Sequence, residues 1–184
     1  AFATGTAGAV VNAAEDTEST VAVITSDNSW SITLTGQDGT VTKSGTGNAS
    51  ISLTSTEVST LGQGDVTISG SATDTAGNTT SVAASNLFSI DNQAPGFSLA
   101  TGAAGLLVNA SEDTETNLVA VTADAGQSWS VTLTGQSGTV TKSGTGTGTI
   151  SLSSGEITTL GQGSVLVSGS ATDTAGNTTS VAAS

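Results

Sequence analysis

The chain has 184 residues, including 15 acidic residues and two lysines but neither cysteine nor histidine, and its formal net charge is -13. This charge argues against nucleic acids and anionic membranes as partners. The missing cysteine and histidine exclude disulfides, the commonest zinc ligands and the usual general base of an enzyme. No apolar run approaches the roughly 20 residues of a membrane-spanning helix. Patterned aliphatic residues in a chain that is 35% hydrophobic argue against disorder.

An internal repeat determines the organisation of the chain. Residues 29–85 align with residues 128–184 at a shift of about 99 positions, and about four positions in five are identical. We therefore predict two domains, 1–93 and 94–184. The second copy stops before any equivalent of residues 86–91, so we expect its last strand to be truncated and its edge to fray.

Within each copy the hydrophobic residues recur with a period of two, which predicts β-strands. In the segment 128–134, Trp129, Val131 and Leu133 share one face while serine and threonine occupy the other. Glycines at both ends of 135–138 predict a hairpin turn after this strand. The alternation breaks at 154–161, where we expect one helical turn that closes the core with a leucine.

About seven short strands per copy, separated by turns every 8–12 residues, predict an all-β fold of two tandem immunoglobulin-like β-sandwiches joined by a short linker. Trp30 and Trp129 lie in strongly alternating strands, so we expect both indoles in the cores rather than on a binding surface. Lys43 and Lys142 lie in threonine-rich strands that we expect at sheet edges, where a charge discourages pairing with another chain.

Acidic and amide side chains gather in four separate stretches of the chain. Connecting loops alternate between the two ends of a sandwich, so these stretches should converge at the joint around Pro95. Ca²⁺ takes 6–8 oxygen ligands from carboxylates, amides, backbone carbonyls and water, whereas Mg²⁺ demands a tighter octahedron. We therefore predict a Ca²⁺ site whose candidate ligands are Glu15, Asp16, Asp91, Asn92, Asp124 and Asp173.

Each acidic motif also has a simpler interpretation. The segment around Glu15 and Asp16, which recurs at Glu112 and Asp113, is alternatively a solvated acidic loop. The segment 173–177, which recurs at 74–78, predicts a hairpin turn in which aspartate caps the backbone while glycine and asparagine take left-handed conformations. The turn and the metal site do not exclude each other.

Four motifs follow one another in a fixed order: Asn-Ala-Ala/Ser-Glu, Leu-Gly-Gln-Gly before a strand and Ala-Thr-Asp-Thr-Ala-Gly-Asn, which occur in both copies, and Ile-Asp-Asn-Gln-Ala-Pro, which occurs once, at the linker. In this order they resemble the bacterial immunoglobulin-like extender repeats of giant surface adhesins, namely biofilm-associated proteins and RTX adhesins exported by type I secretion. The resemblance implies long arrays that project a ligand-binding tip, with Ca²⁺ at the domain joints. Matched by motif, it implies Asp91, Asp173 and Glu15 as metal ligands. The glycine-rich RTX nonapeptide is absent.

We therefore expect a monomeric, extracellular spacer at the bacterial cell surface that contributes to adhesion and biofilm formation, contacts neighbouring repeats and does not insert into a membrane. We do not expect an enzyme, because a glycosidase with paired acids needs an aromatic-lined cleft. The alternatives are a ligand-binding adhesive module and a passive, metal-free linker. Ice binding by the glycine and threonine residues of 144–149 is disfavoured because the first copy does not keep that array.

Overall fold

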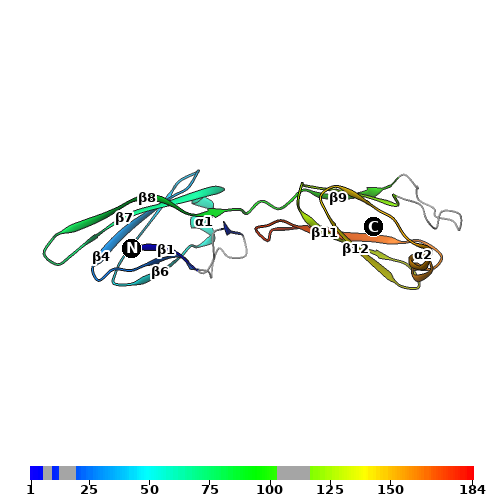
Figure 1. Ribbon diagram of the computed structural model, residues 1–184, viewed down its shortest axis with the longest axis horizontal. Helices are drawn as coiled ribbons and strands as arrows, with labels where there is room; N and C mark the ends of the chain where they lie inside the picture. Colours follow the sequence, from blue (N-terminus) through cyan, green and yellow to red (C-terminus); the bar gives the residue numbers. More distant parts are fainter. Residues whose placement is uncertain (6–9, 13–19, 103–116) are drawn as a thin grey trace. The chain divides into compact units, whose positions relative to one another are not determined.

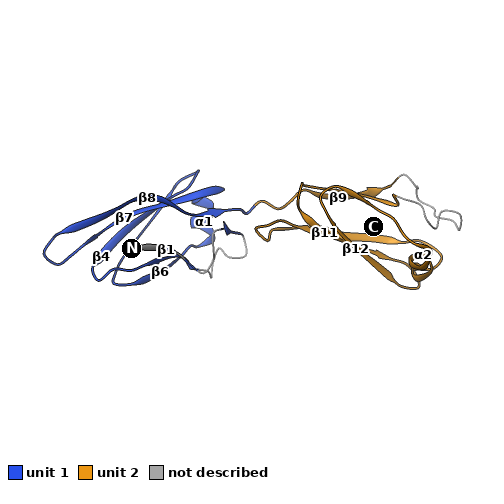
Figure 2. Ribbon diagram, viewed as in Figure 1, with its two compact units in different colours: residues 1–92 blue, residues 93–184 orange. Residues whose placement is uncertain are grey.

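The computed structural model describes residues 1–5, 10–12, 20–102 and 117–184. The chain divides into two compact units, Ala1–Asn92 and Gln93–Ser184 (Figure 2). Strands dominate the described part of each unit and one short helix accompanies them (Figure 1), which confirms an all-β fold. No helix in the described ranges is long and apolar enough to cross a membrane.

Unit 1 contains a sheet of order β1-β3-β6 and a larger sheet of order β2-β8-β7-β4-β5. Neighbouring strands are antiparallel, except that β2 and β8 run parallel. The helix α1 connects β6 to β7 (Figure 1). The bounds are β1 Phe2–Thr4, β2 Val10–Val11, β3 Thr20–Ile24, β4 Ser29–Thr35, β5 Thr40–Thr46, β6 Ala49–Ser52, α1 Ser55–Leu61, β7 Gly64–Thr73 and β8 Thr79–Ile90.

Unit 2 repeats this plan within its described residues. Its two antiparallel sheets have the orders β9-β10-β13 and β12-β11-β14-β15. The bounds are β9 Phe97–Thr101, β10 Val119–Ala123, β11 Ser128–Thr134, β12 Thr139–Thr145, β13 Gly148–Ile150, α2 Ser154–Leu160, β14 Leu166–Thr172 and β15 Thr178–Val181.

The core of each unit lies between its two sheets, because buried residues of both sheets belong to one cluster. The predicted alternation in β11 is confirmed, since Trp129, Val131 and Leu133 are buried while the serines between and before them are exposed. The hairpin after β11 is also confirmed, with the Gly135 amide donating to the Gly138 carbonyl. Burial on one face of each strand is therefore what holds the two sheets together.

Both tryptophans lie in the cores, as predicted. Trp30 is 7% exposed and its indole N–H donates to the Gly47 carbonyl at 2.8 Å, so its single polar group is satisfied. The backbone passes close to the ring, because a Cβ built on Gly45 would lie 2.6 Å from the Trp30 Cζ2. Trp129 makes the equivalent bond to Gly146 in unit 2.

The predicted helical turn is confirmed as α2, and α1 is its counterpart in unit 1. Each helix begins with a capping box, in which the hydroxyl of Thr54 or Ser153 and the carboxylate of the glutamate three residues later cap each other's backbone amides. Each ends before a glycine with positive φ, Gly62 or Gly161. Leu160 is 3% exposed, so it closes the core as expected.

Two apolar residues that continue an alternating pattern in the sequence lie outside the observed strands. β13 ends at Ile150, so Leu152 follows the strand although it is buried, and β14 begins at Leu166, so Val165 precedes it. Phe88 is buried in the core of unit 1, and Phe97 packs against the core of unit 2. The division into domains 1–93 and 94–184 remains a prediction, since compactness does not test whether each half folds alone.

Both lysines link an edge strand to a helix. Lys43 Nζ lies 2.5 Å from Glu57 Oε1, and Glu57 Oε2 accepts from the Thr54 amide at 2.9 Å. The hydrogen bond from Lys43 lowers the pKa of Glu57 below its usual 4.5. Burial raises this pKa, and hydrogen bonds from Thr54 lower it further. Because the pKa is depressed in the folded state, this stabilisation is present above pH 4.5 and is lost as the pH falls through the folded pKa.

We predict that Glu57→Ala destabilises unit 1 by about 1 kcal/mol at pH 7, since it removes a partly exposed ion pair and half of a capping box. The difference from the unsubstituted chain should shrink below pH 4.5. Urea titrations at pH 7 and pH 3 measure it. A difference of the same size at both pH values would contradict this role of the Glu57 charge.

Candidate metal centre

The candidate ligand Asp91 lies directly after β8 in unit 1. Its amide donates to the Val11 carbonyl at 2.9 Å, which extends the parallel pairing of Val11 with Ile90. Asn12, which follows Val11, is therefore held beside this end of β8. Glu15 and Asp16 follow Asn12 by three and four residues in the sequence, and both of these candidates lie outside the described residues.

Asn92 is fixed through its backbone, and its amide donates to Gln63 Oε1 at 3.1 Å. Gln63 lies between α1 and β7, in the Leu-Gly-Gln-Gly motif. The side-chain oxygen Oδ1 of Asn92 is buried and has no hydrogen-bond partner. A buried acceptor oxygen without a donor is costly, and a cation supplies what a donor would.

Asp124 holds the start of unit 2. Its Oδ2 accepts from the Gly96 amide at 2.6 Å, and its own amide donates to the Gly96 carbonyl at 3.3 Å. A Cβ on Gly96 would lie 2.9 Å from Asp124 Oδ1, so glycine is required for this close approach. A carboxylate that accepts one bond from an amide retains further lone pairs for a cation. In the first copy Thr25 occupies the position of Asp124.

The hairpin that contains Asp173 lies near the same end of unit 2. The hydroxyl of Thr179, in β15, donates to the Pro95 carbonyl at 2.6 Å. Since the turn at Asp173 leads directly into β15, Asp173 belongs to the Pro95 end of this unit. Asp124 reaches the same end through Gly96, the next residue of the chain.

The Asp173 carboxylate is already occupied by its own turn. Oδ1 accepts from the Asn177 amide at 2.8 Å and Oδ2 from the Asn177 side chain at 3.0 Å. Burial raises the pKa of Asp173, but hydrogen bonds from Asn177 and the neighbouring amides outweigh it and lower the pKa. Asp74 makes the same bonds to Asn78. The capped turn is thus observed in both units, and both carboxylate oxygens of Asp173 accept hydrogen bonds within it.

One detail of the turn prediction is wrong. Only glycine is left-handed there, with φ of 93° at Gly77 and 94° at Gly176, and neither Asn78 nor Asn177 has a positive φ. The asparagines instead receive the aspartate bonds through their backbone and side-chain amides. Their role is to hold the carboxylate and not to bend the chain.

The structure therefore locates four of the six candidate ligands, and these four form two pairs. Asp91 and Asn92 are consecutive at the linker end of unit 1, and Asp124 and Asp173 lie toward the Pro95 end of unit 2. No group of three or more histidine, cysteine or acidic side chains suited to a metal ion occurs in the described residues. A metal centre would therefore need amide, carbonyl or water oxygens in addition to these carboxylates.

Two uncharged residues near the candidate ligands were not predicted from the sequence. Gln63 orients Asn92, and Gln127 follows Asp124 in its turn, where the Gln127 amide donates to the Asp124 carbonyl. Like Asn92 Oδ1, the side-chain oxygen Oε1 of Gln127 is buried without a partner. The Leu-Gly-Gln-Gly motif was the available signal for Gln63, whereas no motif distinguished Gln127.

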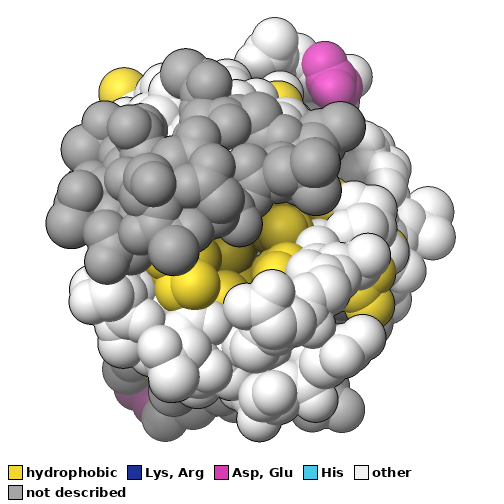
Figure 3. All heavy atoms as spheres, turned by 90° about the vertical axis from the view of Figure 1, so that its right-hand side faces the viewer, with side chains coloured by type: hydrophobic (Ala, Val, Ile, Leu, Met, Phe, Trp, Pro, Cys, Tyr) yellow, Lys and Arg dark blue, Asp and Glu magenta, His cyan; other side chains and the backbone are white. Residues whose placement is uncertain are grey.

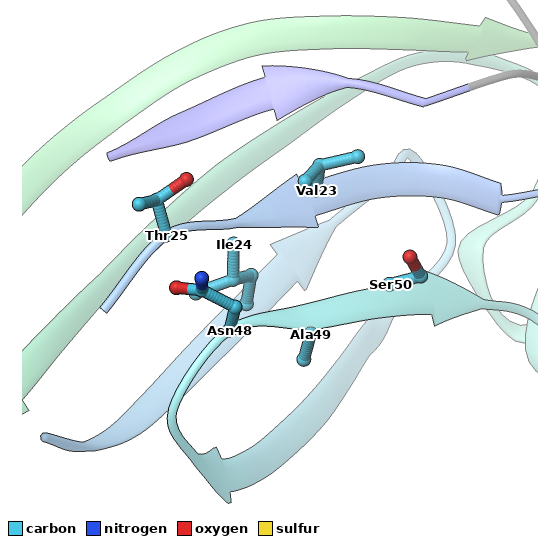
Figure 4. Close-up of a pocket in the computed structure, with 6 residues that line it drawn as sticks. All are labelled: Val23, Ile24, Thr25, Asn48, Ala49 and Ser50. Carbon is cyan, nitrogen blue, oxygen red and sulfur yellow. The ribbon is translucent and has the colours of Figure 1, made fainter. Parts of the chain in front are cut away.

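A surface hollow of about 220 Å³ lies over β3 and β6 of unit 1 (Figure 4). Aliphatic and small polar side chains line it, and none of them is titratable in the physiological range. It therefore supplies neither a general acid nor a charged anchor. The lining residues are Val23, Ile24, Thr25, Asn48, Ala49 and Ser50.

Comparison with solved structures identifies two with a similar fold. One is a structure of a 1.5-MDa bacterial ice-binding adhesin, which was solved to explain the retention of that adhesin at the host cell surface. It matches 100% of this chain at 23% identity, with a TM-score of 0.53. The other is a Ca²⁺-stabilized adhesin that helps an Antarctic bacterium reach out and bind ice, with a TM-score of 0.51, 20% identity and coverage of 98%. The chain shares its fold with these two adhesin structures.

The chain spans 62% and 46% of the lengths of those two structures. A tetra-tandem repeat in the extending region of a large adhesion protein matches 90% of the chain at 23% identity, with a TM-score of 0.42. No family model and no curated protein matches the sequence. At these identities the likeness establishes the fold, and function has to be argued from the residues.

Proposed function

We propose that the chain is a spacer segment of an extracellular bacterial adhesin, built from tandem immunoglobulin-like sandwiches and stiffened at its joint by Ca²⁺. The observation that carries the proposal is that one unit occurs twice in succession with the fold of large bacterial adhesins. Repetition lengthens the protein without introducing a new kind of functional site, which suits a segment that holds a distal adhesive tip away from the cell.

The donor chemistry at the linker supports Ca²⁺. Asp91 in unit 1 and Asp124 in unit 2 each lie at the end of their own unit where the linker attaches. Asn92 Oδ1 and Gln127 Oε1 add two neutral oxygens that lack donors. Carboxylate and amide oxygens are the ligands that Ca²⁺ takes, and the chain has neither the cysteine nor the histidine that zinc favours.

Sequence position supports a contribution from the acidic segment. The Asp91 amide donates to the Val11 carbonyl. Glu15 and Asp16 follow Val11 by four and five residues in the sequence, and we retain both as proposed ligands. Asp173, whose carboxylate is occupied by its turn, would contribute more weakly.

The proposed mechanism is a linkage between ion binding and the geometry of the joint. Two unit charges about 4 Å apart interact by about 1 kcal/mol in water and by several times more near protein. Without a cation, acids gathered at the joint repel one another and favour its open conformations. Bound Ca²⁺ neutralises this repulsion, because the carboxylates coordinate the same ion. The angle between the domains is therefore restricted.

This function needs neither catalysis nor a foreign partner. We propose that the chain is not an enzyme, that it is monomeric and that its partners are neighbouring repeats, with no nucleic acid and no insertion into membranes. The net charge of -13 supports the last two exclusions. A passive, metal-free linker is the competing proposal, and it predicts a joint that is indifferent to Ca²⁺. A ligand-binding adhesive module is the other alternative.

Calorimetric titration with Ca²⁺ tests the proposal directly. We predict a dissociation constant on the order of 10⁻⁴ to 10⁻³ M, as in other extracellular modules, and stabilisation by about 2.7 kcal/mol at a hundredfold excess over it. Asp91→Ala should weaken binding, whereas Glu57→Ala, which removes the same charge from an ion pair with Lys43, should not. Equal effects of the two substitutions would show that the site is elsewhere.

Solution scattering separates stiffening from binding. When Ca²⁺ replaces a chelator, the maximum dimension of the chain should increase. The distribution of dimensions over the population of molecules should become narrower. Mg²⁺ at the same concentration is the control, because its octahedral geometry suits this mixed set of oxygens poorly. Neither heat nor a shift in melting temperature at millimolar Ca²⁺ would favour the passive linker.

A further inference from the structure

The sequence contains four Asn-X-Ser/Thr triplets in which X is not proline, beginning at Asn48, Asn78, Asn109 and Asn177. In a secreted protein this triplet is an acceptor for an N-linked glycan, whose first sugar joins the side-chain nitrogen Nδ2 of the asparagine. The sequence does not distinguish the four triplets. Asn109 lies outside the described residues, and the structure separates the other three by the environment of this nitrogen.

Two of these three asparagines have their side-chain nitrogen engaged. Nδ2 of Asn78 donates to Asp74 Oδ2 at 2.8 Å, and Nδ2 of Asn177 donates to Asp173 Oδ2 at 3.0 Å. Asn177 is also only 8% exposed. Hydrogen bonds to a carboxylate are stronger than those between neutral groups. The hairpin turns therefore hold both nitrogens away from an incoming sugar.

Asn48 presents its side-chain nitrogen to solvent. The residue is exposed and follows Gly47 in the turn between β5 and β6. Its Oδ1 accepts from the Ser26 amide at 3.0 Å, which orients the side chain, while Nδ2 has no hydrogen-bond partner among the described residues. The turn is open, because Gly47 has a φ of 72° and a Cβ built on it would meet nothing within 4 Å.

The equivalent turn of unit 2 shows that this exposure is a property of the turn. Thr147 occupies the position of Asn48 at the shift of 99, and it is also exposed, although residues 93–96 precede β9 in that unit. The Thr147 hydroxyl donates to the Ala123 carbonyl at 3.1 Å. Since threonine serves at the same position, the turn does not require asparagine. Unit 2 therefore has the turn without the acceptor nitrogen.

We propose that Asn48 is an N-glycosylation site of the folded chain and that Asn78 and Asn177 are not. In the reaction, Nδ2 of Asn48 forms a bond to the anomeric carbon of a hexose. The bond between that carbon and the phosphate oxygen of a nucleoside diphosphate hexose breaks, and the nucleoside diphosphate leaves. A glycosyltransferase takes up the amide proton. The inference depends neither on Ca²⁺ nor on the spacer role.

The surroundings of Asn48 suit a neutral sugar. Asn48 lines the hollow of about 220 Å³ over β3 and β6, together with Val23 and Ser50 (Figure 4). Val23 is 37% exposed, and a hexose that extends from Asn48 over the hollow would cover part of this apolar surface. Uncharged polar groups and backbone also make up most of the described surface in the view of Figure 3.

A glycan at this position would also protect a sheet edge. The order β1-β3-β6 makes β6 an edge strand of its sheet, and its residues Ala49–Ser52 carry no charge. An edge strand without a charge is open to pairing with another chain, and natural proteins cover or charge such edges. A bulky, hydrated sugar on the residue that precedes β6 would hinder that pairing.

Enzymatic glycosylation of the full chain tests the proposal. The chain is incubated with UDP-glucose and a soluble N-glycosyltransferase that recognises the Asn-X-Ser/Thr triplet, and glycopeptides are measured by mass spectrometry. We expect one hexose on Asn48 and an occupancy at least about tenfold lower on Asn78 and Asn177, because their hydrogen bonds to carboxylates must break first. Asn48→Gln and Ser50→Ala should each remove the signal from this triplet.

Two controls separate the fold from the sequence of the triplets. Synthetic peptides of residues 45–52 and 75–82, in which the fold holds neither asparagine, should both accept hexose. Asp74→Ala frees Nδ2 of Asn78 in the full chain, so it should raise the occupancy of Asn78 by about tenfold and leave Asn48 unchanged. The absence of hexose on Asn48, equal occupancy of Asn48 and Asn78, an unmodified 75–82 peptide or an unchanged Asn78 in Asp74→Ala would each overturn the inference.

Discussion

Phe88→Ala is expected to destabilise unit 1 by about 3–5 kcal/mol, a typical cost for removing a buried aromatic side chain. Phe88 is 3% exposed and lies opposite Val66, so alanine would leave a cavity beside β7 and open the path of water to Val58 and Ile68. A domain of this size is stable by about 5–15 kcal/mol, so the loss is a large fraction of the total. Urea unfolding in a Trp129→Phe background measures it, because Trp30 then reports on unit 1 alone.

Val82→Ala is the matched control, since Val82 lies in the same strand and is 38% exposed. It should cost less than about 1 kcal/mol, because little apolar surface is withdrawn from water at that position. If the two substitutions had equal effects, Phe88 would not be the residue that closes the core.

The all-β architecture was predictable because burial on one face imposes a period of two on the sequence. Trp129, Val131 and Leu133 show this most clearly, and all three are buried in β11. The turn at 135–138 and the helix α2 were predictable because glycine and a capping pattern act locally. Whether each unit is an immunoglobulin-like sandwich remains a proposal.

The exact strand ends were less predictable, because alternation of apolar and polar residues indicates which side chains are buried. It does not indicate which backbone segments pair. Leu152 and Val165 both continue an alternating pattern, but neither belongs to a strand. A residue is in a ladder only if a partner backbone lies beside it, and that partner comes from elsewhere in the chain. In unit 1 the partner of Val66 is Phe88, 22 residues away in sequence.

The candidate site was predictable only in part. The linker motif drew attention to Asp91 and Asn92, whose role as ligands stays a prediction. The alternation of loops predicted Asp124 and Asp173 at one end of unit 2, and both lie toward its Pro95 end. The availability of each oxygen depends on hydrogen bonds that a motif does not encode. Asp173 is occupied by Asn177, whereas Gln127, which belongs to no motif, has a buried oxygen without a partner.

Leu61→Ala is expected to destabilise unit 1 by about 2–5 kcal/mol. Leu61 is the last residue of α1 and is fully buried, and its carbonyl accepts from the Asp38 amide. The backbone around it is close-packed, because a Cβ on Gly36 would overlap the Leu61 carbonyl. The surroundings therefore cannot collapse into the space that the side chain vacates, which places the cost toward the upper part of the range.

Thermal unfolding of the full chain in the Trp129→Phe background measures this loss, and Val23→Ala is the control because Val23 is 37% exposed on the same unit. The helix has only seven residues, too few to be stable on its own, so its contribution comes from this buried contact and not from helix propensity. If Leu61→Ala cost no more than Val23→Ala, the helix would be an attachment to the surface of the unit and not the closure of its core.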